Sequence, residues 1–467
     1  MDSTPFQLLT RWSGGTLLQG DPGRAVTRVC TDSRSLEPGD LFVALRGETF
    51  DGHAFVAEAA RRGAAGALVD ASFEANFEAN GIDAAFGLIR VDDTLAGLQA
   101  LARGYRATLP LRVVALTGSS GKTSTKDFTA AVLGERFRVT KTQGNFNNHI
   151  GLPLTILRAS SDDEIGIFEI GMNHPGEIAP LAALAAPDVA VITNIGVAHI
   201  EFLGSREAIA QEKGMLAEAL PPNGSLVMNA DDDFCASIAA RTPARTVLAG
   251  LTADAAVRGT VLETGFGGSR FLVRAGEEEA EVALPVPGLH MVENALLALA
   301  VGHLFGVPLS EGAAGLAKSR LTKGRLEQKT LGGIHVLDDS YNANPDSMRA
   351  ALQTLASLPA EGARIAVLGR MGELGAESEP AHRSVGEAAA RAGIDELIAV
   401  GAEAAFIAEA ARSAGLARVC HAADPAAAAA LLAERVRPGD LVLLKGSRSA
   451  RMERVLEHPV FASPAHA

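Results

Sequence analysis

The sequence contains few cysteines and few aromatic residues. Its three cysteines, Cys30, Cys235 and Cys420, lie far apart and match no metal-binding or redox spacing, which is typical of a protein from a reducing compartment. Only 4% of the residues are aromatic, whereas 47% are hydrophobic, so we expect large cores built mainly from aliphatic side chains. At roughly 150 residues per domain, a chain of 467 residues predicts about three domains.

Long apolar runs and an excess of basic charge are also absent. No segment approaches the roughly 20 apolar residues that span a bilayer, and the apolar stretch 181–195 is broken by Pro187 and Asp188. The first residues, MDSTPFQLLTRWSGG, lack the basic head and apolar stretch of a secretory signal. The net charge is 42 − 55 = −13, which disfavours nucleic-acid binding. We therefore predict a cytoplasmic monomer that neither binds nucleic acid nor inserts into membranes.

The chain reads as three α/β domains, at residues 1–90, 91–325 and 326–467. The first mixes short strands with turn signals and has a helix followed by a strand at 53–70. In the second, which opens with a helical pattern at 94–109, apolar runs alternate with helices, and short strands at 246–286 suggest an antiparallel extension. Such alternation indicates a doubly wound, mostly parallel sheet covered on both faces. The third domain shows the same alternation of apolar runs and helical segments. It is predicted to be a Rossmann-like α/β domain, with an alanine-rich surface helix at 422–436.

A phosphate-binding loop is predicted at residues 117–124, TGSSGKTS, between a predicted strand and a predicted helix. Small residues let backbone N–H groups turn inward, and a helix start favours anions. Lys122 can reach the terminal phosphates, and the Thr123 hydroxyl can ligate Mg²⁺. Leu116 stands where the full motif has glycine, so this is a shortened GxxGKT version. The predicted nucleotide-binding residues are Gly118, Ser119, Ser120, Gly121, Lys122, Thr123 and Ser124. The alternative is a chance GKT in a tight turn, which the flanking elements disfavour.

Polar residues also follow the later predicted strands of the central domain. Glu169 lies near one strand end, and Asn194 and His199 lie just past another. Ligands of doubly wound sheets sit outside the carboxyl ends of the strands, so these side chains are candidate metal ligands. Each also has a simpler explanation, since Glu169 could cap a turn and His199 could be a hydrogen-bonded packing residue.

Seven segments occur in the order seen in the Mur ligases, and the chain resembles that family over most of its length. The segments are TGSSGKTS, EIGMNHPGEI, NIGVAHIEFLG, QEKGML, MVENALLALA, KGRLE and DDSYNANPDSM. The resemblance implies a cytoplasmic enzyme that builds the peptide stem of peptidoglycan by ATP-driven amide bond formation. In this family the γ-phosphate of ATP passes to a substrate carboxylate, and an amine then attacks the acyl phosphate.

Three segments resemble one kind of member in particular: GNFNNHIGLPLTIL, EIGMNHPGEI and DDSYNANPDSM. They imply UDP-N-acetylmuramoyl-tripeptide and D-alanyl-D-alanine as the small-molecule substrates. The family member that adds the third stem residue usually carries a DNPR-type motif when it selects diaminopimelate, and this chain has none. The sequence leaves open whether the tripeptide ends in lysine or in diaminopimelate.

The resemblance further implies ATP and two Mg²⁺ ions as cofactors. Thr123 and Glu169 would hold one ion, and Glu169 and His199 would belong to the second site. Lys213, in QEKGML, matches a lysine that many members carry as a carbamate, an anion able to help hold Mg²⁺. Together Lys122, Glu169, His199 and Lys213 form the predicted catalytic set. Without the resemblance, Lys213 would be an ordinary helix lysine.

Contacts to ATP and to the other substrates follow from the same resemblance. Asn294, Arg325 and Asp339 match positions that contact the base, the phosphates and the ribose of ATP. The predicted substrate-binding residues are Lys445, Ser447 and Arg448 near the last strand, Ser33 in the first domain, and Asn145, Asn147 and Asn148 in the central domain. Turn chemistry at Asp339 and in the asparagine-rich loop, and a solvated basic loop around Lys445, are the alternatives.

Two other functions fit parts of this pattern. A nucleotide-driven switch needs the phosphate loop and metal ligands, but not a C-terminal domain with further nucleotide contacts. Folylpolyglutamate synthetases share the ligase plan, and the NFNN and SYNANP segments argue against them. ATP turnover that depends on both predicted substrates would separate the three.

Overall fold

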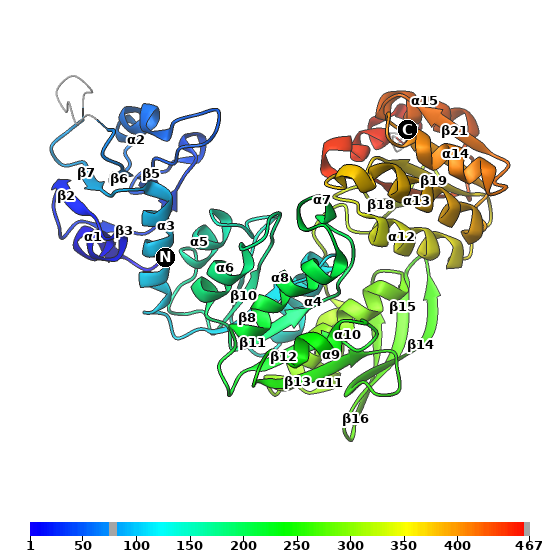
Figure 1. The fold of residues 1–467 in the computed structure, drawn as a ribbon, viewed down its shortest axis with the longest axis horizontal. Coiled ribbons are helices and arrows are strands. Elements are labelled where there is room, and N and C mark those ends of the chain that lie inside the picture. Colours follow the sequence, from blue (N-terminus) through cyan, green and yellow to red (C-terminus); the bar gives the residue numbers. More distant parts are fainter. Residues whose placement is uncertain (74–81, 462–467) are drawn as a thin grey trace, which may run out of the picture. The chain divides into compact units, whose positions relative to one another are not determined.

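A computed structural model describes residues 1–73 and 82–461 of the chain (Figure 1). These residues form two compact units. Among the described residues, one unit consists of 1–73, 82–115, 137–172 and 177–188, and the other of 116–136, 173–176 and 189–461. Strands and helices alternate along both units, so the predicted α/β class is confirmed. The boundaries predicted at 90/91 and 325/326 stay predictions.

The N-terminal part of the chain contains a five-stranded sheet in the order β2-β7-β6-β5-β4, in which only β2 is antiparallel to its neighbour. Its strands are β2 (Thr16–Gln19), β4 (Val29–Cys30), β5 (Leu41–Val43), β6 (Gly66–Val69) and β7 (Gly87–Arg90). A two-stranded sheet pairs β1 (Thr4–Pro5) with β3 (Ala25–Val26). The helices are α1 (Phe6–Ser13), α2 (Val56–Arg61) and α3 (Thr94–Arg106), with short 3-10 turns η1 (Ser33–Ser35) and η2 (Gly52–Phe55). The helix and strand expected at 53–70 are α2 and β6.

Helix α3 begins where the sequence predicts. The side chain of Asp93 accepts a hydrogen bond from the Ala96 N–H at 2.7 Å and so caps the helix. One face buries Leu98, Leu101 and Tyr105. The Tyr105 hydroxyl donates to the carbonyl of Ala159 at 2.8 Å, and burial raises its pKa to about 12. This tyrosine is therefore a structural anchor within its unit.

The second sheet has nine strands in the order β16-β15-β14-β13-β12-β11-β8-β10-β9. They are β8 (Arg112–Thr117), β9 (Val139–Lys141), β10 (Ile165–Glu169), β11 (Val189–Ile192), β12 (Ser225–Asn229), β13 (Arg245–Gly250), β14 (Val257–Gly265), β15 (Gly268–Ala275) and β16 (Glu278–Leu284). Strands β11 to β14 pair in parallel, and β14 to β16 are antiparallel. The antiparallel extension predicted at 246–286 is thus confirmed from β14 onward, whereas β13 continues the parallel part.

The helices of this region include α4, which begins where the phosphate loop ends. They are α4 (Lys122–Leu133), α5 (Gly151–Ile156), α6 (Ile178–Ala185), α7 (Ile200–Leu203), α8 (Arg206–Glu218), α9 (Cys235–Ala239), α10 (Leu289–Leu304) and α11 (Leu309–Ala317). Helix α10 packs against α4 and buries most of its 16 residues. Across the described ranges, no helix combines the length and apolar character needed to cross a membrane.

The C-terminal sheet, coloured yellow to red in Figure 1, has six strands in the order β17-β18-β22-β19-β20-β21, with only β17 antiparallel. They are β17 (Glu327–Leu331), β18 (Ile334–Asp339), β19 (Arg364–Gly369), β20 (Glu396–Val400), β21 (Val419–Ala422) and β22 (Leu441–Lys445). The helices are α12 (Pro345–Ser357), α13 (Ser378–Ala392), α14 (Ala405–Ser413) and α15 (Pro425–Arg435), with turns η3 (Gly375–Glu377), η4 (Arg448–Ala450), η5 (Met452–Glu457) and η6 (Pro459–Phe461). The alanine-rich segment is helical, as predicted, and Asp424 caps it.

Candidate active site

The phosphate loop runs from the end of β8 to the start of α4 and depends on two glycines. Gly118 has φ = +150° and Gly121 has φ = +79°, conformations that other residues rarely adopt. A Cβ atom at Gly118 would lie 1.9 Å from Oγ1 of Thr193, and one at Gly121 would lie 2.4 Å from Oδ1 of Asn294. The loop is therefore packed against the end of β11 and against α10, and only glycine fits at either position.

Asn194, which follows β11, holds the loop in place. The N–H of Ser119 donates to its carbonyl, and the N–H of Ser120 donates to its Oδ1, both at 3.0 Å. The Thr193 hydroxyl donates to the Ser120 carbonyl at 2.5 Å. The structure thus brings the loop and the residues past β11 together, as the strand order predicts.

Cationic side chains gather where α4 begins. Nζ of Lys122 donates to the carbonyl of Gly118 at 2.5 Å, so this lysine lies over its own loop. Nη2 of Arg325 donates to the Thr123 hydroxyl at 3.3 Å, and its guanidinium lies 4.3 Å from the ring centroid of Tyr341. A helix start with two cations beside it favours the binding of an anion such as a polyphosphate.

His199 lies at the end of the segment 194–199, in a left-handed conformation with φ = +64°. Its Nδ1 is 2.6 Å from Oε2 of Glu373 in the C-terminal part of the chain. Burial lowers the pKa of His199, and the Glu373 carboxylate opposes that shift. Sequence reasoning missed Glu373, because 174 positions separate it from His199 and nothing in its own motif points to a histidine.

Lys213 lies on α8 and only 1% of it is exposed. Burial lowers its pKa well below the ordinary value, and the positive charge of Lys122 lowers it further. Glu212 acts in the opposite direction. The surroundings of Lys213 therefore shift its equilibrium toward the neutral amine.

Asp339 and Lys445, at the ends of the neighbouring strands β18 and β22, form a buried ion pair. Nζ of Lys445 lies 2.5 Å from Oδ2 of Asp339 and also donates to the carbonyl of Asn342 at 2.9 Å. Only 1% of Lys445 is exposed, so it does not belong to a solvated basic loop. His290, on α10, was missed from the sequence: burial lowers its pKa to about 4, while Asp339 acts to raise it.

Replacing Asp339 with alanine is expected to destabilise the protein by about 3–5 kcal/mol, since it leaves the Lys445 ammonium buried without its carboxylate. Urea unfolding measures this loss. The double variant Asp339→Ala, Lys445→Met removes both charges and should recover most of the stability. A single variant as stable as the parent would show that the pair contributes little to the fold.

In the other unit, Asn147 and Glu169 lie together. Nδ2 of Asn147 donates to Oε1 of Glu169 at 2.9 Å, and the Glu169 N–H donates to the hydroxyl of Thr142 at 3.0 Å. Asn148 accepts the N–H of Gly151 at 2.9 Å, whereas Asn145 is exposed. The structure thus joins one predicted substrate residue to a predicted metal ligand.

The remaining predicted substrate residues lie in loops. Ser33 is half-buried at the start of η1, and its carbonyl accepts a hydrogen bond from Arg62 at 2.9 Å. Ser447 is buried, and its N–H donates to the carbonyl of Arg370 at 2.8 Å. The side chain of Arg448 is 68% exposed and pairs with Glu453 at 3.2 Å.

The oxygen ligands near the phosphate loop bear on whether Mg²⁺ could bind there. Within residues 1–73 and 82–461, no group of three or more histidine, cysteine or acidic side chains is placed to hold a metal ion by itself. Magnesium usually takes one or two protein oxygens and completes its shell with water and substrate phosphates. Thr123, beside the phosphate loop, and Glu169, in the other unit, are both buried and carry oxygens of the type that Mg²⁺ takes.

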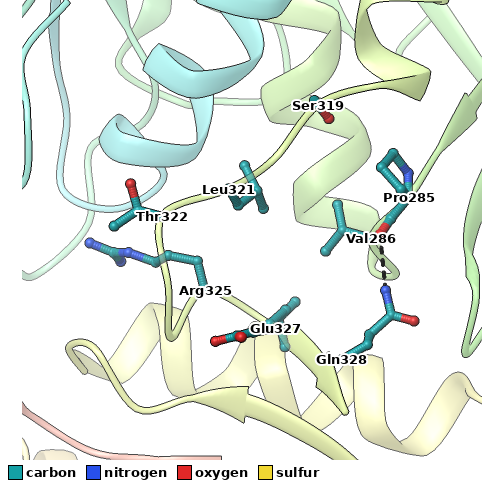
Figure 2. Close-up of a pocket in the computed structure, with 9 residues that line it drawn as sticks. Pro285, Val286, Ser319, Leu321, Thr322, Arg325, Glu327 and Gln328 are labelled. Carbon is teal, nitrogen blue, oxygen red and sulfur yellow. Dashed lines mark hydrogen bonds between the residues drawn. The ribbon is translucent and has the colours of Figure 1, made fainter.

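A pocket of ≈ 200 Å³ lies beside the connection between the central and C-terminal sheets. Figure 2 shows Val286 and Leu321 facing each other across it, while Gln328 donates to the carbonyl of Pro285 at 3.0 Å. Arg325 lines the pocket and also reaches the phosphate loop through Thr123. The pocket therefore lies beside the phosphate loop.

Comparison with known proteins agrees with this geometry. Residues 116–302 match the Mur ligase middle domain, residues 324–448 match the Mur ligase glutamate ligase domain, and residues 25–106 match the Mur ligase family catalytic domain. The chain therefore belongs to the Mur ligase family. As a member it is an ATP-dependent ligase that forms amide bonds.

Individual relatives are similar over nearly the whole chain. The UDP-N-acetylmuramoyl-tripeptide–D-alanyl-D-alanine ligase of Bacillus subtilis is 40% identical over 431 residues, 92% of each chain. A crystal structure of MurF from Acinetobacter baumannii has a TM-score of 0.88 at 32% identity and covers 98% of both chains. MurF from Thermotoga maritima in complex with ADP has a TM-score of 0.81 at 31% identity, over 92% of this chain and 96% of that one.

Proposed function

We propose that this ligase joins D-alanyl-D-alanine to UDP-N-acetylmuramoyl-tripeptide in peptidoglycan synthesis. ATP would phosphorylate the tripeptide carboxylate, the dipeptide amine would attack the acyl phosphate, and ADP and phosphate would leave. The observation that carries the proposal is the 40% identity to a curated relative with this activity over 92% of both chains. A reaction between cytoplasmic precursors also favours a cytoplasmic enzyme.

The nucleotide site supports the first step. Phosphoryl transfer requires mainly positioning and neutralisation of charge. The phosphate loop from Gly118 to Ser124 would hold the phosphates, and Lys122 and Arg325 would neutralise them. Asn294, which contacts the hydroxyl of Thr125 at 3.2 Å, would lie near the base, and Asp339 near the ribose.

We further propose that the ligase works with Mg²⁺. The ion would neutralise phosphate charge during transfer. Thr123 and Glu169 are its proposed protein ligands, with Glu169, His199 and a carbamate on Lys213 assigned to a second ion. The depressed pKa of Lys213 supports the last assignment, because only a neutral amine adds CO₂.

The roles of the three domains in binding the substrates and ATP are also part of the proposal. Residues 1–90, including Ser33, would bind the UDP part, and residues 91–325 would carry ATP chemistry. Residues 326–467, including Lys445, Ser447 and Arg448, would complete the site. Asn145, Asn147 and Asn148 would face the sugar and peptide. The hydrogen bond between Asn147 and Glu169 supports this placement, since it links a substrate-binding loop to a metal ligand.

The test is a substrate-dependence assay. ADP release is expected only when UDP-N-acetylmuramoyl-tripeptide and D-alanyl-D-alanine are both present, and the pentapeptide product should appear in equal amount. Tripeptides ending in lysine and in diaminopimelate are compared, with a folate plus glutamate mixture as the control. Turnover with the control mixture, or with ATP alone, would contradict the proposal and favour a folylpolyglutamate-type ligase or a nucleotide switch.

A further inference from the structure

We propose that two carboxylates of the C-terminal part, Asp346 and Glu373, are positioning residues that hold the segment 196–199 and thereby orient His199. Both lie in the same compact unit as the phosphate loop. The inference rests on the proposed function only in giving His199 a role in catalysis.

Asp346 holds the start of the segment. It is the second residue of α12, and its Oδ2 accepts the N–H of Val197 at 2.9 Å. Nη2 of Arg349 donates to the other oxygen at 2.6 Å, which fixes the carboxylate in place. A Cβ atom at Gly196 would lie 2.0 Å from Oδ2 of Asp346, so glycine at position 196 is what permits this approach.

The same helix start also contacts the phosphate loop. Nδ2 of Asn344, the N-cap of α12, donates to the carbonyl of Ser119 at 3.2 Å. The hydroxyl of Ser119 accepts the N–H of Gly196 at 2.8 Å. One end of α12 therefore contacts the phosphate loop and the segment together, and it sets their relative position.

Glu373 holds the end of the segment through Nδ1 of His199, 2.6 Å away. Its backbone has φ = +60°, and its loop is fixed on both sides by the buried side chain of His382. Nε2 of His382 accepts the N–H of Met371 at 3.0 Å, and Nδ1 donates to the carbonyl of Ser378 at 2.6 Å. Glu373 is thus presented by a rigid loop.

The contact with Glu373 influences which nitrogen of the His199 ring carries the proton. A carboxylate oxygen 2.6 Å from Nδ1 favours the tautomer that carries its proton on Nδ1, and this leaves Nε2 with its lone pair. Nε2 is then the atom that can act as a ligand or acceptor. Asp346 fixes the backbone two residues before His199, and Glu373 fixes its ring, so the C-terminal part controls both.

The first experiment is a double-variant cycle between Gly196→Ala and Asp346→Ala. Each change breaks the same contact, so each should lower kcat about tenfold with little change in the KM of the dipeptide. The double variant should then be no slower than the slower single variant, because contacting residues are not additive. Losses that multiply to about a hundredfold would overturn the role of Asp346.

The second experiment observes His199 directly by ¹⁵N NMR of histidine-labelled full-length protein, with His199→Gln used to assign its signals. The parent should show the Nδ1–H form. Glu373→Ala should shift the signals toward a mixture of tautomers, and Glu373→Gln, which keeps an acceptor, should restore them. Glu377→Gln, at an exposed position in the same loop, is the matched control. Unchanged His199 signals in Glu373→Ala would overturn the inference. This result does not depend on turnover, so it is distinct from failure of the proposed substrates.

Discussion

Replacing Lys122 with alanine is expected to lower kcat by about 10³-fold. The lysine lies over the phosphate loop, and its ammonium is the charge best placed to stabilise the phosphoryl group during transfer. Because the two glycines and Asn194 shape the loop, its backbone should survive the substitution. Product formation under saturating substrates measures the loss, and circular dichroism confirms the fold.

A matched control is Lys318→Ala, which removes a lysine that is 68% exposed and pairs with Glu135. It should keep the activity of the parent, since an exposed pair contributes little. Near-normal amide formation by Lys122→Ala would contradict the assignment of residues 117–124 as the ATP phosphate site.

Replacing Lys213 with alanine should also leave the enzyme nearly inactive, by about 10²-fold or more, if a carbamate there helps hold Mg²⁺. Short carboxylates such as acetate or propionate should partly restore activity, because they can occupy the space and supply the anion that the truncated side chain lacks. Activity is titrated against added carboxylate at fixed ATP and Mg²⁺.

The variant Lys213→Met distinguishes loss of the carbamate from loss of buried side-chain volume. Methionine fills most of the same buried volume but cannot be carbamylated, and it leaves no room for the added carboxylate. It should therefore be inactive and resist rescue while unfolding at a similar temperature to the parent. Parent-like activity in either variant would make Lys213 a structural residue.

Periodicity and local motifs predicted the elements that carry the site. The apolar runs before Thr117 and Ile192 are buried strands, and GxxGKT at 118–123 leads into a helix, as expected for a phosphate loop. Both signals are local in sequence. The same reasoning placed Asn194 near the loop, because strand ends of a parallel sheet meet at one edge.

Contacts between residues that lie far apart in the sequence could not be predicted from local patterns. Glu373 is an ordinary glutamate in its own segment, and only the turn at φ = +60° and the anchoring by His382 direct it to His199. For Lys445 the sequence left a solvated basic loop as one interpretation, and only its burial beside Asp339 excludes that one. At β13 the composition gave no sign that the pairing is parallel on both sides, since strand direction depends on the chain's path between strands.

The N-cap residue of α12 has two roles, and a substitution there changes both. Asn344 uses Oδ1 to satisfy the Ser347 N–H and Nδ2 to contact Ser119, so one side chain both starts a helix and docks it. Fraying of that first turn and separation of the C-terminal part are therefore coupled. Any change that loosens the helix end shifts the protein toward an undocked state, and any ligand that favours docking stabilises the helix end by the same free energy.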